Sequence, residues 1–132
     1  MKFLKIFLII FISINTSLKA DSKNNLIQSL KQGGKLIFIR HAYAPGGGDP
    51  ENFNLDDCAT QRNLSKSGQI QAIKIGNFFI ENQVEIKKIY SSEWCRCKET
   101  ASIAFQNFET KSFLNSFFGS KFTHNRQKQV IE

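Results

Sequence analysis

The stretch Lys35-Leu36-Ile37-Phe38-Ile39-Arg40-His41 decides the fold, because an apolar run ends there in a cation and an imidazole. A continuous apolar run of this length is typical of a strand covered on both faces, so we predict a first strand over Lys35–Ile39. In parallel α/β sheets, ligands bind beyond the carboxyl ends of the strands. Arg40 and His41 therefore stand where a phosphate group could bind. A guanidinium holds two phosphate oxygens and a neutral imidazole can attack phosphorus.

An Arg-His pair at a strand end can equally be an ordinary surface pair, because a two-residue signal is weak. The segment that follows, Ala42–Thr60, favours the functional interpretation. It contains Gly46-Gly47-Gly48, two prolines and no periodicity, which predicts a long loop. Loops of this length inside small domains are usually functional.

The remaining periodicities predict an α/β domain. Apolar spacing predicts helices over Asp21–Gln32, from Lys66 to about Asn82 and over Cys95–Phe105, and a second strand over Ile86–Tyr90. Ser65 is suited to cap the second helix, on which Ile70, Ala72, Ile73, Ile75 and Phe79 form a broad apolar stripe. The alternation of strands and helices predicts right-handed crossovers and a parallel sheet. Two strands are too few for such a sheet, so either Phe108–Phe118 supplies a third or the domain is incomplete.

The amino terminus, Met1–Ala20, has the pattern of a secretory signal peptide: a basic start, a short apolar centre and a small residue at the end. An uncleaved anchor is the alternative, although the apolar centre is shorter than the roughly 20 residues of a membrane span. Cleavage would leave one small domain, residues 21–132, in the periplasm or outside the cell, with no membrane span. It would lower the net charge from +7 to +4, because three lysines and no acidic residue leave with it. Scattered lysines without aromatic platforms argue against a nucleic-acid partner, and a mildly basic surface favours a small phosphorylated one.

Three cysteines, Cys58, Cys95 and Cys97, are an odd number for an exported chain. Cys95 and Cys97 are two residues apart at a helix start and are poor partners for each other. We therefore expect Cys58 to form a disulfide with one of them, which would join the long loop to the segment that carries Arg96. A Cys/His metal site is the alternative, but a second ligand pair is missing, so we expect no metal.

Three segments, taken in order, resemble a known family. They are Arg40-His41-Ala42, then Leu64-Ser65-Lys66-Ser67-Gly68, then Ser91-Ser92-Glu93-Trp94-Cys95-Arg96-Cys97-Lys98-Glu99-Thr100-Ala101. Together they are similar to the motifs of the histidine phosphatase superfamily, the phosphoglycerate-mutase-like proteins. The resemblance covers residues 34–118. It implies a three-layer αβα fold with a parallel-type sheet, of which this chain would lack the C-terminal part.

The resemblance also implies roles for individual residues. His41 would be the nucleophile that takes the phosphoryl group, and Arg40 and Arg96 would clamp its oxygens. Arg62, Thr100 and Tyr43 would contact the substrate, although Arg96 could be an exposed helix residue and Thr100 a structural one. The reaction implied is phosphomonoester hydrolysis through a phosphohistidine, without a cofactor.

Two departures from the family pattern keep a second interpretation open. The second histidine of the family follows a late apolar strand, and no such strand precedes His124, which we take for a surface residue. The family's proton donor is also unassigned: Ser116 stands where mutase-like members have Glu, and Asp49, Asp56 or Asp57 could substitute. The alternative is therefore a truncated or degenerate member that binds phosphorylated ligands without turnover.

Overall fold

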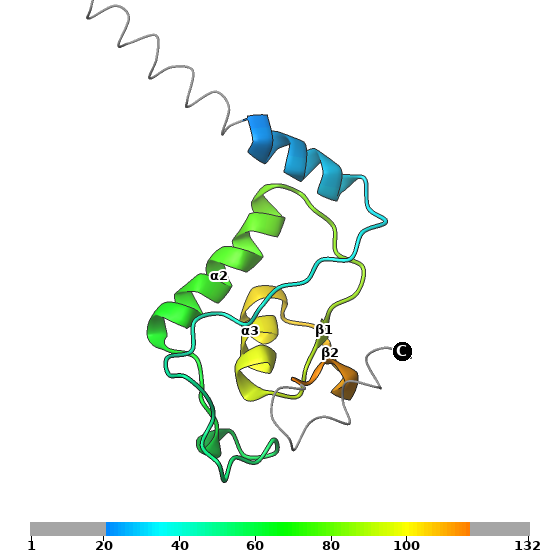
Figure 1. The fold of residues 1–132 in the computed structure, drawn as a ribbon. Helices are drawn as coiled ribbons and strands as arrows, with labels where there is room; N and C mark the ends of the chain where they lie inside the picture. The colour runs from blue at the N-terminus through cyan, green and yellow to red at the C-terminus, as the bar shows by residue number, and fades with distance from the viewer. Residues whose placement is uncertain (1–20, 117–132) are drawn as a thin grey trace, which may run out of the picture.

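A computed structural model describes residues 21–116 of the chain (Figure 1). Residues 21–31 are helical, as expected, and Gly33 and Gly34 follow with φ of 68° and 66°, in the left-handed region that favours glycine. The elements after them are the 3-10 helix η1 (Cys58–Thr60), helix α2 (Lys66–Glu81), strand β1 (Tyr90–Ser91), helix α3 (Cys95–Phe105), strand β2 (Glu109–Thr110) and the 3-10 helix η2 (Ser112–Leu114). No helix within residues 21–116 is long and apolar enough to span a membrane.

Helix α2 begins and ends where its sequence indicates. The Ser65 hydroxyl accepts a hydrogen bond from the Gly68 N–H at 3.1 Å, which satisfies one of the free donors of the first turn. At the other end, the Asn82 side chain donates to the Phe78 carbonyl at 2.7 Å. The predicted apolar stripe is only partly buried: Ala72 and Phe79 are buried, whereas Ile70 and Ile73 are about half exposed.

Helices α2 and α3 pack closely against each other (Figure 1). The contact depends on Gly76, since a Cβ atom there would lie 3.0 Å from the carbonyl carbon of Ala104 and closer still to its oxygen. The rings of Phe79 and Phe105 meet at 5.5 Å between centroids. Helix α3 has the predicted bounds, and Arg96 lies in its first turn.

The sheet of the described chain consists of two short parallel strands. Strand β1 pairs with β2 in the register Tyr90↔Glu109 and Ser91↔Thr110, and α3 connects them. The α/β class and the parallel pairing therefore agree with expectation. The second predicted strand is confined to its last residue and Ser91, and the predicted third strand is represented by β2. The three-layer arrangement is not present in residues 21–116, which hold two strands in one sheet.

The prediction of a buried strand over Lys35–Ile39 is wrong. This segment is extended but is not a strand, and Leu36 and Phe38 are 86% and 85% exposed. Within residues 21–116, β1 pairs with β2 and no strand is hydrogen-bonded beside Lys35–Ile39. An apolar run indicates that a segment can be buried, but a strand also needs a neighbour for its backbone groups. The segment still leads to the residues that join α3 and the start of α2: the Ala42 N–H donates to the Thr100 hydroxyl, and the Tyr43 carbonyl accepts from the Ser65 N–H.

Candidate functional site

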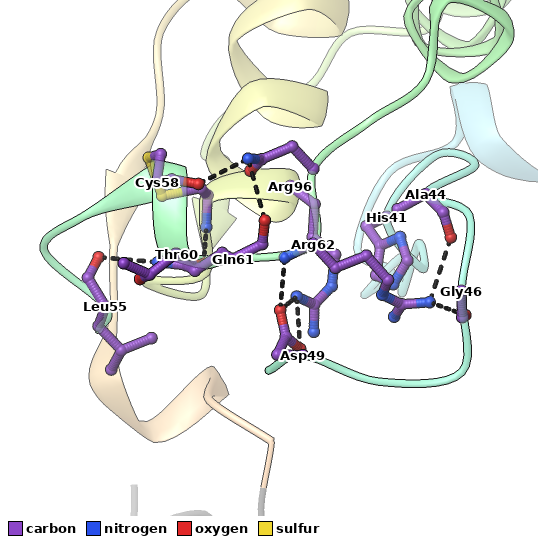
Figure 2. A network of polar contacts seen from close by, with 12 residues as sticks. His41, Ala44, Gly46, Asp49, Leu55, Cys58, Thr60, Gln61, Arg62 and Arg96 are labelled. Atoms are coloured by element: carbon purple, nitrogen blue, oxygen red, sulfur yellow. Dashed lines mark hydrogen bonds and ion pairs between the residues drawn. A yellow bond between two sulfur atoms is a disulfide. The ribbon is translucent and has the colours of Figure 1, made fainter. Parts of the chain in front are cut away.

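His41, Arg62 and Arg96 come together from three parts of the chain (Figure 2). His41 follows the extended segment, Arg62 precedes α2 and Arg96 lies in the first turn of α3. Asp49 directly follows the three glycines of the loop Ala42–Thr60, the glycine-rich loop, and lies between the two arginines. The structure thus gathers candidates that are up to 55 positions apart in the sequence.

The His41 ring is half-buried and held in one tautomer. Its Nδ1 atom lies 2.7 Å from the Ala42 carbonyl oxygen. A carbonyl oxygen only accepts hydrogen bonds, so Nδ1 carries the proton and Nε2 keeps the lone pair. Burial lowers the pKa of His41 below its ordinary value of 6.5; the Ala42 bond opposes this, and Arg96, Arg40 and Arg62 lower the pKa further. His41 is therefore neutral at pH 7, with Nε2 available as a nucleophile.

Arg96 is buried, so the interpretation as an exposed helix residue is wrong. Its Nη1 atom donates to both carboxylate oxygens of Asp49, at 2.9 and 3.0 Å. Its Cζ atom lies 4.5 Å from the centroid of the Trp94 ring, within the range of a cation–π contact. Its Nε atom is buried and has no hydrogen-bond partner among the described residues.

The guanidinium of Arg62 is held by backbone carbonyl oxygens. Its Nη1 atom donates to the carbonyl oxygens of Ala44 and Gly46, at 3.1 and 2.6 Å, and its backbone N–H donates to Asp49 at 2.9 Å. Its Nε atom is also buried without a partner in the described part of the chain. A buried donor without an acceptor costs about 1–3 kcal/mol, and more when charged. Two such donors on cations beside a neutral imidazole favour binding of an oxyanion.

The other candidates hold the site together or lie at its edge. The Thr100 hydroxyl accepts from the Ala42 N–H at 3.0 Å and donates to the Arg96 carbonyl at 2.7 Å, so both its bonds are to backbone. Its position is therefore structural: it ties the residue after His41 to α3. The Tyr43 backbone is fixed by Gln71 and Ser65, while its ring is 58% exposed. Arg40 is exposed and acts on His41 through its charge.

The structure contains a disulfide between Cys58 and Cys95, one of the two pairings expected for Cys58. It joins η1 to the first residue of α3, and Gln61 reinforces the junction by accepting the Cys95 N–H at 3.0 Å. Cys97 is a free thiol, and burial raises its pKa. Arg96 lowers this pKa and Asp49 raises it, so the thiol lies within the field of the ion pair.

Some features of the site were not apparent from the sequence. Asp49 is one of three candidates for the proton donor, and the sequence does not indicate its contacts with Arg62 and Arg96; of the other two, Asp57 caps η1 through the Ala59 N–H. The sequence around Trp94 likewise does not indicate its contact with Arg96. His124 lies outside the described residues.

The described residues include no metal-binding cluster, and two hollows lie among them. Among residues 21–116, no cluster of three or more His, Cys, Asp or Glu is placed to hold a metal ion. Two hollows, of about 470 and 490 Å³, lie beside the disulfide and between the ends of α2 and α3. Neither of these two hollows is lined by His41, Arg62 or Arg96.

Comparison with known proteins shows a partial similarity to a solved structure. No family model matches the chain, and no curated protein matches it. A solved structure, of a protein assigned as the phosphohistidine phosphatase SixA from Agrobacterium tumefaciens, is similar to part of it. The TM-score is 0.43 and the identity 23%, over 56% of this chain and 46% of that one. The chain thus spans less than half the length of that structure.

Proposed function

We propose that this chain is a phosphomonoesterase of the histidine phosphatase type, acting on a small phosphorylated substrate. The observation that carries this proposal is the neutral imidazole of His41, whose Nε2 has no hydrogen-bond partner among residues 21–116 and whose pKa is lowered by burial first and then by Arg96, Arg40 and Arg62. Three cations around one neutral nucleophile suit an anionic electrophile. The ordered sequence motifs that contain the same residues support this assignment.

In the proposed reaction, Nε2 of His41 attacks the phosphorus of a phosphate monoester. The bond between phosphorus and the ester oxygen breaks, and the leaving oxygen takes a proton from solvent water to give the alcohol. Water then attacks the phosphohistidine, so that inorganic phosphate leaves and His41 returns to its neutral form. The guanidinium groups stabilise the charge on the equatorial oxygens, which is the main contribution of a protein to phosphoryl transfer.

The test compares the full chain with His41→Ala on an aryl phosphate at pH 7. We expect the variant to lose turnover, and the unmodified chain to form an acid-labile phosphoprotein that the variant does not form. His124→Ala is the matched control, because it removes the other imidazole of the chain. Equal rates for the chain and His41→Ala would refute the mechanism.

One observation favours a second candidate, a protein that binds phosphorylated ligands without turning them over. The acidic group at the site, Asp49, accepts hydrogen bonds from Arg62 and Arg96 that occupy both of its carboxylate oxygens. It is therefore poorly placed to donate a proton to a leaving alcohol. Inorganic phosphate binding that is weakened in Arg96→Ala, in a chain without turnover or phosphohistidine, would select this candidate.

We also propose that residues 1–20 are a secretory signal and that residues 21–132 form one domain outside the cytoplasm. The Cys58–Cys95 disulfide supports an oxidising compartment. The mass of the protein recovered from the periplasm or the medium tests this proposal. An unprocessed chain that remains in the cytoplasm would contradict it.

A further inference from the structure

The carboxylate of Asp49 is the contact that Arg62 and Arg96 share. It accepts from Nη1 of Arg96 at 2.9 and 3.0 Å and from the backbone N–H of Arg62 at 2.9 Å. The side chains of Asp49 and Arg96 are each 9% exposed. A carboxylate in this place has a larger effect than a surface ion pair, because water screens it little.

Asp49 fixes which part of the Arg96 guanidinium is available. Nη1 is taken by Asp49, and the face of the group lies over Trp94 at 4.5 Å. The Nε edge has no acceptor among the described residues. Because a guanidinium is a rigid plane, holding one nitrogen and one face sets the direction of the remaining N–H groups.

From this geometry, and on the basis of the function proposed above, we propose that Asp49 is a positioning residue of the phosphate site. It holds Arg96 in one orientation, in which Nε is left without an acceptor among the described residues, so that a guanidinium donor that Asp49 does not use can bind a phosphoryl oxygen, and it links Arg62 to the same anchor. The Gly46–Gly48 run before it lets the loop reach this position. The role differs from that of a proton donor: Asp49 acts through Arg96 and does not touch the substrate.

The first measurement needs no ligand. Trp94 is the single tryptophan of the chain, so its fluorescence reports the contact with Arg96. Asp49→Asn keeps an oxygen that can accept the Arg62 N–H but loses the charge that holds Arg96. We expect acrylamide to quench Trp94 more strongly in Asp49→Asn than in the unmodified chain. Asp56→Asn is the matched control, with the same charge change in the same loop and no contact with Arg96, and it should leave quenching unchanged.

The second measurement determines phosphate affinity by calorimetry in a double-mutant cycle. Asp49→Asn alone should weaken binding of inorganic phosphate about tenfold, because the freed guanidinium loses its orientation. In the Arg96→Ala background the same change should strengthen binding several-fold, since it removes an unpaired carboxylate next to the anion. A residue that only stabilised the loop would weaken binding in both backgrounds.

The outcomes separate this inference from the proposed function. Unchanged quenching in Asp49→Asn, or weaker binding in both backgrounds, would overturn the positioning role alone. An unmodified chain that does not bind phosphate would overturn the proposed function, and with it the role of Asp49 in that function. Asp49→Glu keeps the charge and guards against a folding defect: its quenching should lie closer to that of the unmodified chain, and quenching equal to that of Asp49→Asn would contradict the inference.

Discussion

Removing the Cys58–Cys95 disulfide should destabilise the domain by an amount that the loop length sets. The bridge spans 37 positions. In the chain-entropy model, opening a loop of this size frees unfolded-state entropy worth about 4 kcal/mol at 25 °C. A small domain has roughly 5–15 kcal/mol of stability in total, so the loss is a large share. It should also loosen the site, since Cys95 directly precedes Arg96 and η1 directly precedes Gln61.

The assay is urea unfolding followed by far-UV circular dichroism, with Cys97→Ala as the common background to prevent thiol exchange. We expect Cys58→Ala/Cys95→Ala in that background to unfold at a much lower urea concentration. Cys97→Ala alone should stay within about 1 kcal/mol of the unmodified chain, because it removes a partly buried thiol and no crosslink.

A thiol titration provides the independent check. Under denaturing conditions the unreduced chain should show one reactive thiol, Cys97, and the reduced chain three. Three thiols before reduction would show that the bridge is absent. An unfolding midpoint unchanged by loss of both cysteines would refute the entropic reasoning.

Three further predictions concern groups around His41. Gly68→Ala should destabilise the fold, because the new Cβ would lie 3.0 Å from the Tyr43 carbonyl carbon, and this clash outweighs the roughly 1 kcal/mol by which alanine favours a helix over glycine. Gly47→Ala, which has open space around it, is the control. A higher melting temperature of Gly68→Ala would contradict this prediction. By NMR titration His41 should have a pKa below 6.5, so that its contribution to stability falls as the pH drops below 6.5, where the unfolded chain binds the extra proton. Added phosphate should raise this pKa, because an anion favours the imidazolium; a pKa that falls or stays constant would argue against a shared site. Thr100→Val should lower the free energy of unfolding in urea by about 1–3 kcal/mol, because it leaves the buried Ala42 N–H without its acceptor. The control Thr110→Val changes an exposed residue and should have little effect. Equal effects of the two changes would refute the role of Thr100.

The parts of the fold that depend on local signals could be predicted from the sequence. Ser65 and the apolar spacing after it define α2, and α3 has the bounds that its periodicity indicates. The segment Lys35–Ile39 could not be predicted in this way, since its apolar side chains carry no information on whether another strand lies beside it. The burial of Ile70 and Ile73 could not be predicted for the same reason. An apolar stripe shows which face of a helix can pack, but the packing partner decides how much of that face is covered.

The site shows the same division. The positions of His41 and Arg96 follow from ordered motifs that the chain carries in its sequence. The pairing of Asp49 with Arg96, 47 residues apart, depends on how the glycine-rich loop folds back, and nothing near Asp49 distinguishes it from Asp56 or Asp57. The contact of Trp94 with Arg96 depends likewise on side-chain directions at the start of α3.

The exposure of Leu36 and Phe38 also bears on how the protein behaves in a concentrated solution. Between Lys35 and Arg40 the chain presents four apolar side chains and an extended backbone to water, and charges stand only at the two ends of this segment. We expect purified samples to lose monodispersity on concentration, through cross-β pairing of this segment between molecules. Affinities for phosphate are therefore best measured in dilute protein, with light scattering as a check on particle size.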